Sequence, residues 1–129
     1  MPVLLLISAS AYTIAKTLHI IGAFMVVLGA GALVFEKEGG PSRKLIMIFH
    51  GIGMLVLFLA GFAILGFQKY QFGLWVIVKL VIWLIFGASV VLAKKGIIFK
   101  GVGGWIAVIV LAGLAAAMAV MGVKEVNVG

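Results

Sequence analysis

Residues 17–35, TLHIIGAFMVVLGAGALVF, decide the fold because they form an apolar stretch long enough to cross a bilayer. One ionisable side chain, His19, stands within this stretch. A second histidine, His50, and a lysine, Lys79, stand in the next two hydrophobic stretches. Ionisable side chains are costly inside a membrane, so these three are the first candidates for chemistry.

The composition places the whole chain in the membrane class. Of the 129 residues, 66% are hydrophobic and 10% are charged, a balance that a soluble core cannot accommodate. The net charge of +7 comes from basic residues at the ends of hydrophobic stretches, so we expect the lipid bilayer as partner and no nucleic acid. The chain has no cysteine, which excludes thiolate metal sites and disulfide chemistry.

Charged and glycine-rich breaks divide this single domain into four predicted membrane spans. The break 36–44, EKEGGPSRK, combines charge, Gly-Gly and Pro41 and is typical of a tight loop between helices. We therefore predict an all-α fold, an integral membrane antiparallel four-helix bundle. Its opening residues are expected to lie in the interface or to form a tilted helix that projects from the membrane. The predicted spans cover about residues 12–35, 45–67, 74–93 and 105–123.

The basic residues predict the orientation of the bundle, because cytoplasmic loops carry an excess of lysine and arginine. On one side of the bilayer the sequence places Lys37, Arg43, Lys44, Lys94, Lys95 and Lys100. On the other side it places Lys16, Lys69 and Lys124. We predict a multi-pass inner-membrane protein with both termini outside the cytoplasm.

Small residues accompany the histidines and mark the fourth span. Those near the histidine faces are Ala15, Gly22, Ala23, Ala30, Gly53 and Gly61, and they make room for either a partner helix or a flat cofactor. The fourth span offers Ala112, Ala116, Ala119 and the pair Gly113 and Ala117. Because such residues let helices approach closely, we predict a homo-oligomer.

The three ionisable residues leave several interpretations open. Each histidine is either polar glue between helices, an axial ligand of haem iron, or a group for proton transfer or ion passage. His19 and Lys79 lie at similar depth, whereas His50 is displaced from them by roughly 12 to 15 Å along the membrane normal. One haem held by both histidines of one chain would therefore need shifted span boundaries, strong tilt or a second subunit.

Lys79 stands between Trp75 and Trp83 at i−4 and i+4, where a cation–π contact is expected. It either snorkels to the interface or pairs with a buried anion such as a haem propionate, a carboxylate substrate or a quinone oxygen. No carboxylate lies within a predicted span, which disfavours a small proton-coupled drug exporter.

Three segments resemble the small haem-associated membrane proteins of the protoporphyrinogen-oxidase and copper-resistance-D type. They are TLHIIGAF in the first span, FHGIGMLVLFLAGF in the second and WVIVKLVIWL in the third. The resemblance implies an inner-membrane helical bundle with a histidine in its first span and, in the protoporphyrinogen-oxidase branch, a lysine preceded by a tryptophan. These positions match His19, Lys79 and Trp75. The chain lacks the arginine-bearing loops and extra histidines of the enzymatic branch, so the resemblance favours tetrapyrrole contact over catalysis.

The resulting hypothesis is a small, redox-linked membrane cytochrome or tetrapyrrole-binding protein. Its cofactor-binding residues would be His19, His50 and Lys79, with both histidines as iron ligands of haem b, and porphyrin or quinone as other ligands. The alternatives are a non-enzymatic structural or accessory membrane protein and a small transporter or channel subunit. Enzymatic activity stays open.

Overall fold

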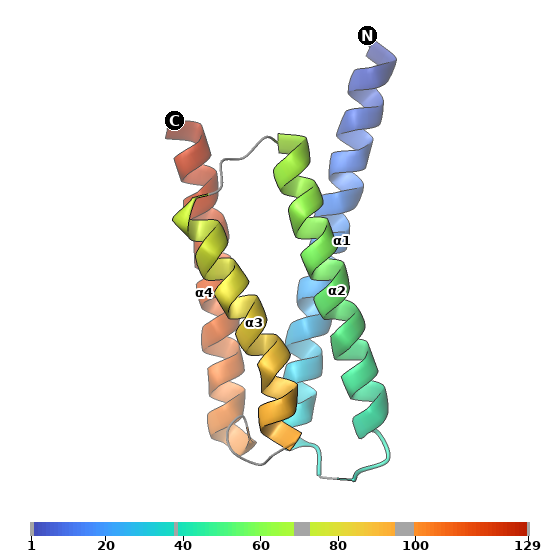
Figure 1. The fold of residues 1–129 in the computed structure, drawn as a ribbon, viewed down its shortest axis with the longest axis vertical. Helices are drawn as coiled ribbons and strands as arrows, with labels where there is room; N and C mark the ends of the chain where they lie inside the picture. The colour runs from blue at the N-terminus through green and yellow to red at the C-terminus, as the bar shows by residue number, and fades with distance from the viewer. Residues whose placement is uncertain (1, 38, 69–72, 95–99, 129) are drawn as a thin grey trace.

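The computed structural model describes residues 2–37, 39–68, 73–94 and 100–128 of the chain. Within these ranges it contains four helices: α1 (Pro2–Phe35), α2 (Arg43–Gln68), α3 (Leu74–Lys94) and α4 (Gly101–Val128). Successive helices run in opposite directions (Figure 1). The start of α1 and the end of α4 therefore lie at one end of the bundle, called the terminal end here, and the α1–α2 and α3–α4 connections lie at the other, the loop end. The predicted all-α antiparallel four-helix bundle is confirmed.

The connection between α1 and α2 turns on a glycine in the left-handed region. Gly39 has a φ of 74°, a backbone conformation that a residue without a Cβ adopts at little cost in free energy. The next turn is closed by the Gly40 N–H, which donates to Lys37 O at 3.0 Å, and by the Arg43 N–H, which donates to Gly40 O at 3.2 Å. Pro41 follows within this turn and has no N–H to satisfy. The predicted break at 36–44 therefore contains the expected tight loop, but its last two residues, Arg43 and Lys44, already belong to α2.

The first helix is longer than a membrane span. At 34 residues, α1 is about 50 Å long, well beyond the hydrocarbon core. Its spanning part is Ala9–Phe35, and the turns before Ala9 continue the same helix past the tops of the other three (Figure 1). The opening residues therefore continue the first helix beyond the other three, and their position relative to the membrane stays a prediction.

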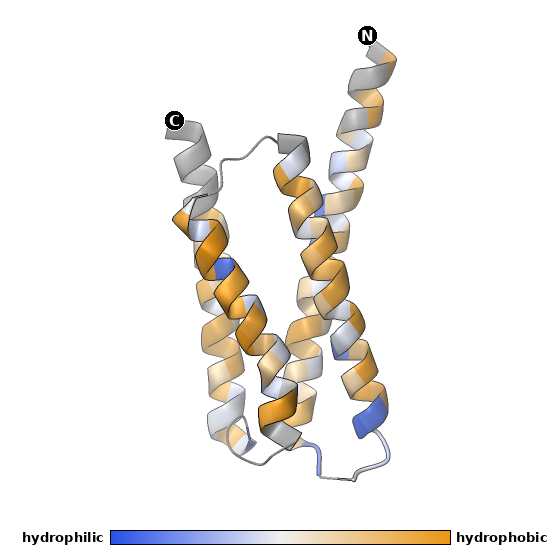
Figure 2. Ribbon diagram, in the orientation of Figure 1, coloured by the Kyte–Doolittle hydropathy of each residue, from blue (hydrophilic) through white to orange (hydrophobic). Residues whose placement is uncertain are grey.

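Most large apolar side chains point outward, as they do in a protein surrounded by lipid. Three segments are long and apolar enough to cross a membrane: Ala9–Phe35, Arg43–Gly66 and Gly101–Val120. The described part of α3 adds a shorter apolar stretch, Leu74–Ser89. Apolar residues cover all four helices (Figure 2), and Phe24, Leu55, Leu84 and Ile109 are among the large exposed ones. The chain is a multi-pass helical membrane protein.

A compact apolar core joins α1, α3 and α4. Its buried members are Val26, Ala30, Val34, Ile82, Phe86 and Val108. Met54 and Leu57 of α2 pack against it from the side. The closest helix pair in the bundle is α1 with α2, and both histidines lie on these two helices.

Candidate functional site

The α1–α2 interface is a seam in which two backbones touch through glycines. A Cβ on Gly22 would lie 2.7 Å from Leu57 N, and a Cβ on Gly53 would lie 2.6 Å from Met25 Cβ and 3.0 Å from Val26 N. Only the missing side chains allow this approach, which is the packing mode of small residues in membrane helices. The small residues beside the histidines therefore accommodate a partner helix, and between α1 and α2 they leave no space for a flat cofactor.

His50 is enclosed in this seam. Its side chain is 2% exposed, and its Cβ lies 2.8 Å from the position of a Cβ on Gly29 of α1. Nε2 of His50 is buried and has no hydrogen-bond partner. A haem iron could reach this buried nitrogen only if the surrounding helices moved apart, so the geometry around His50 does not fit an axial ligand.

His19 has a different environment at the other end of the seam. Its ring lies over Gly61 of α2, and its Nδ1 is 3.3 Å from the carbonyl oxygen of Leu57. A carbonyl can only accept, so we assign the proton to Nδ1, which leaves the lone pair of Nε2 free in the neutral ring. A backbone carbonyl on the far nitrogen is the arrangement that orients metal-ligating histidines. His19 therefore fits a single axial ligand.

The two histidines occupy equivalent places in an antiparallel pair. Each is followed by a glycine three residues later, Gly22 after His19 and Gly53 after His50, and each ring packs on a glycine of the opposite helix. His50 lies at the level of Gly29, ten residues along α1 from His19, which corresponds to about 15 Å. The structure therefore does not bring the two histidines together in one site.

Lys79 of α3 lies close enough to His19 for its charge to act on the imidazole. Its Nζ is 5.9 Å from the centre of the Trp75 ring, within cation–π range. The other flanking tryptophan, Trp83, is used differently, because its Nε1–H donates to Met54 O at 3.0 Å and its ring packs on Phe58 with centroids 4.9 Å apart. The aromatic stripe expected around Lys79 thus reduces to Trp75, while Trp83 joins α3 to α2.

The described part of the chain offers no acidic partner for these groups. Glu36 is the one carboxylate whose side chain is described; it belongs to the loop end, and no ion pair is formed among the described side chains. Nor do three or more histidine and acidic side chains gather into a metal cage in that part. The candidate site is therefore His19 with Lys79 and Trp75, drawn from α1 and α3 against α2.

One residue escaped the sequence analysis. Arg43, assigned there to the basic cluster that sets topology, is 8% exposed, and neither Nη1 nor Nη2 has a hydrogen-bond partner. Its neighbour Lys44 is exposed. Nothing in the letters RK at the start of α2 distinguishes the two, because only the helix rotation decides which of them faces inward.

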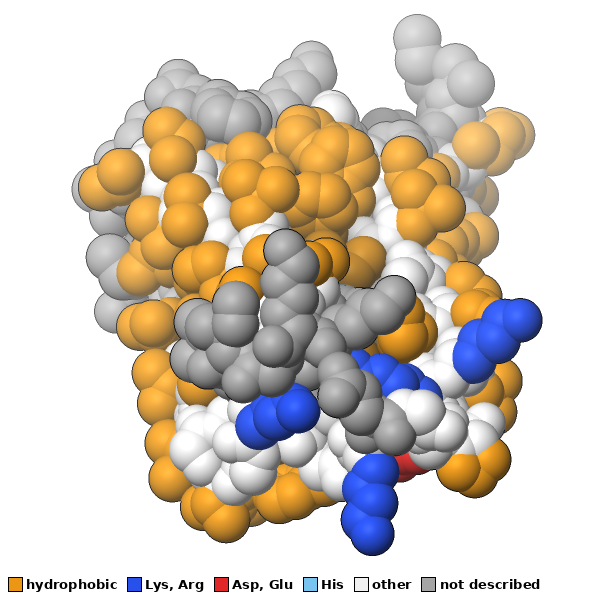
Figure 3. All heavy atoms as spheres, turned by 60° about the horizontal axis from the view of Figure 1, so that its bottom comes forward, with side chains coloured by type: hydrophobic (Ala, Val, Ile, Leu, Met, Phe, Trp, Pro, Cys, Tyr) orange, Lys and Arg blue, Asp and Glu red, His pale blue; other side chains and the backbone are white. Residues whose placement is uncertain are grey.

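The structure describes the side chains of four further basic residues from the predicted charge asymmetry. Lys37, Lys44 and Lys100 are exposed at the loop end, and Lys16 is exposed on α1, where its Nζ lies 6.0 Å from the Tyr12 ring. Basic side chains spread over the loop-end face (Figure 3). Lys69 and Lys95 lie outside the described residues, as do the side chains of Lys94 and Lys124.

On α4, the small residues divide between two faces. Ala112 packs against the core, whereas Gly113, Ala116 and Ala117 are exposed in the single chain. The predicted homo-oligomer stays a prediction.

The fold and the site define a class, a multi-pass helical membrane protein with an ionisable site between its helices. No family model, no curated protein and no solved structure matches the chain.

Proposed function

We propose that this protein binds a tetrapyrrole, haem or its porphyrin, at His19 and Lys79 in the half of the bundle nearer the terminal end. The supporting observation is the orientation of His19, whose Nδ1 is held by Leu57 O so that Nε2 is the nitrogen left to bind iron. The resemblance of TLHIIGAF and WVIVKLVIWL to haem-associated membrane proteins points to the same two residues. Bound haem would supply one-electron redox chemistry.

Lys79 supplies the charge that such a ligand needs. Haem carries propionates, and a lysine without a described acidic partner offers them a cation beside the histidine. The Trp75 ring stabilises the ammonium through its face and adds an apolar surface. A ligand that presents a flat apolar ring and a carboxylate matches these three side chains.

Of the roles that the sequence left open for His50, helix packing is the one taken here. In this proposal His50 packs α2 against Gly29, and His19 is the one protein ligand of the iron from this chain. The competing function is an accessory membrane protein, in which His19 also serves only to join α1 to Leu57 O.

Absorption spectroscopy separates the two functions. We expect purified protein titrated with haem to develop a Soret band that shifts on reduction. His19→Ala should abolish the band, whereas the control His50→Leu, which removes the buried imidazole without touching the site, should retain it. A protein that stays colourless, or a band that requires His50 and not His19, would remove the proposal.

Lys79→Met tests the second half of the site. The apolar stem packs as the lysine stem does, so folding should be preserved. Loss of a charge-assisted hydrogen bond, worth about 1.5–3 kcal/mol, should weaken haem binding by at least roughly tenfold. Combined with His19→Ala, it should give non-additive changes in ligand-dependent thermal stability; strict additivity would separate the two residues.

We also propose that the loop end faces the cytoplasm of a bacterial inner membrane. The basis is the excess of basic residues in the loops at that end. Because the chain has no cysteine, Gly40→Cys and Gly129→Cys provide a clean labelling background. A membrane-impermeant thiol reagent should label intact cells or spheroplasts at position 129 only; labelling of both positions from outside would refute this orientation.

A further inference from the structure

We infer that the loop end of the bundle contains a binding site for an oxyanion, a phosphate or carboxylate group, centred on the buried guanidinium of Arg43. This site lies in the opposite half of the bundle from His19 and Lys79, and it does not depend on the proposed tetrapyrrole function.

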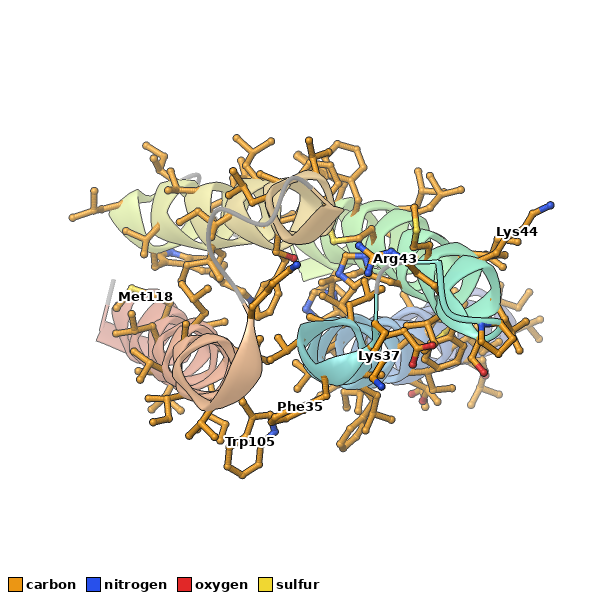
Figure 4. The ribbon with its side chains drawn as sticks, turned by 90° about the horizontal axis from the view of Figure 1, so that it is seen from below. Phe35, Lys37, Arg43, Lys44, Trp105 and Met118 are labelled. Atoms are coloured by element: carbon orange, nitrogen blue, oxygen red, sulfur yellow. The ribbon has the colours of Figure 1, made fainter. Side chains whose placement is uncertain are left out.

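The first observation is the burial of an unpaired charge. Arg43 is 8% exposed, and both of its terminal nitrogens are buried without a hydrogen-bond partner. Seen from below, its side chain reaches in among the ends of α1, α2 and α3, whereas Lys44 extends away from the bundle (Figure 4). A guanidinium cannot escape the cost by losing its proton, so a buried one requires an anionic partner.

The described chain does not provide that partner. Glu36 is the nearest described carboxylate in the sequence, and it forms no ion pair with Arg43. Glu125 belongs to the end of α4, at the terminal end of the bundle. The partner is therefore sought outside the described chain, and Glu38, which lies outside the described residues, enters the test as a control.

The backbone around Arg43 favours the same kind of ligand. Arg43 is the first residue of α2, so the positive end of the helix dipole lies at this level. A helix N-terminus by itself is unremarkable, but here a buried arginine fork without a partner belongs to the first residue of the same helix. Arginine nitrogens bind two oxygens of one phosphate or carboxylate in parallel.

A second buried nitrogen shares this face of α2. Nε2 of His50, seven residues further along and about 10 Å deeper, also has no partner. Arg43, nearer the loop end, is the outer of these two unpaired groups and the one beside the exposed lysines.

Two sources can supply the oxyanion. The exposed lysines around the site, Lys37, Lys44 and Lys100, attract anionic headgroups, and Arg43 lies at the level of these headgroups if α2 spans the bilayer. A soluble phosphate would bind the same fork. The chemistry is shared, and only an experiment with both ligands distinguishes the sources.

The experiment measures the thermal stability of delipidated protein in a zwitterionic detergent. Inorganic phosphate, phosphatidylglycerol and phosphatidylcholine are titrated separately into wild type, Arg43→Gln, Arg43→Lys and the matched control Lys44→Gln. We expect phosphatidylglycerol or inorganic phosphate to raise the melting temperature of wild type and Lys44→Gln in a saturable way. The apparent affinity should fall at least tenfold in Arg43→Gln and by a smaller factor in Arg43→Lys, which keeps the charge but loses the fork. A response to phosphatidylglycerol alone identifies a lipid; a response to phosphate as well identifies a free oxyanion site.

Two outcomes would overturn the inference. They are the absence of stabilisation by either anion in wild type, and an equal loss of response in Arg43→Gln and Lys44→Gln. The control Glu38→Gln should keep the anion response, and that response should still require Arg43. If Arg43→Gln does not fold, Arg43→Lys and native mass spectrometry of lipid bound to wild type and Lys44→Gln decide the question. Wild type without bound anionic lipid and without a phosphate response refutes it.

Discussion

Gly53→Ala is the substitution that most directly tests the α1–α2 seam. The added methyl group would lie 2.6 Å from Met25 Cβ, 3.0 Å from Val26 N and 3.2 Å from Gly22 O. Carbon atoms pack best at about 3.5–4.0 Å, so the two helices must separate by about 1 Å. Two of the three obstructing atoms belong to the backbone of α1, which cannot move aside as a flexible side chain can.

The cost follows from this separation. A gap of about 0.5–1 Å already forfeits roughly a quarter to a half of the attraction between packed atoms, and overpacking a tight interface costs about 1–3 kcal/mol. Gly51→Ala is the matched control, because a Cβ there meets nothing within 4 Å. Both variants gain the same helix preference of alanine over glycine. The difference between their free energies of unfolding therefore measures the contact at Gly53 alone. We expect Gly53→Ala to be less stable than Gly51→Ala by about 1–3 kcal/mol.

Reversible unfolding by sodium dodecyl sulfate in mixed micelles, followed by circular dichroism, measures this difference. A second comparison uses Gly22→Ala, whose Cβ would meet Leu57 N and Gly53 O in the same contact. Once one methyl group has parted the helices, the second should cost less, so the double variant should be less destabilised than the sum. Equal stability of Gly53→Ala and Gly51→Ala, or full additivity of Gly22→Ala and Gly53→Ala, would refute backbone contact at this seam.

Three further predictions concern other parts of the bundle. Trp83→Phe keeps an aromatic ring but loses the hydrogen bond to Met54 O, so it should destabilise the protein by about 0.5–1.5 kcal/mol in the same unfolding assay. Ala116→Leu places a large side chain on the exposed face of α4, so it should leave the stability of the single chain unchanged. If that face forms an oligomer, the same variant should lower the mass measured in detergent. Ala112→Leu, which faces the core, should destabilise the chain itself. Deletion of residues 2–8 should leave the unfolding free energy within about 0.5 kcal/mol, because the described side chains there are exposed and surface changes have small effects.

The candidate site was only partly predictable from the sequence. The similar depth of His19 and Lys79 follows from counting residues along antiparallel spans, and the structure places the two within electrostatic reach. The cation–π contact was assigned to two tryptophans, and the structure shows it with Trp75, because Trp83 turns to Met54 O instead. Trp75 and Trp83, at i−4 and i+4, share a helix face with Lys79 equally well. Only the packing of the neighbouring helix decides which tryptophan contacts the lysine.

The sequence by itself determined the membrane class, the four helices and the places of the breaks between them, whereas α1 and α4 extend beyond the predicted spans. Apolar length, charged breaks, glycine and proline act locally, so they can be recognised without knowing the fold. Only the tertiary structure decided which face of each helix meets a neighbour. In soluble helices the polar face reveals the buried one, but here lipid and core are equally apolar and the contrast disappears. For this reason His50 lies enclosed against Gly29, and Arg43 faces inward beside an exposed Lys44.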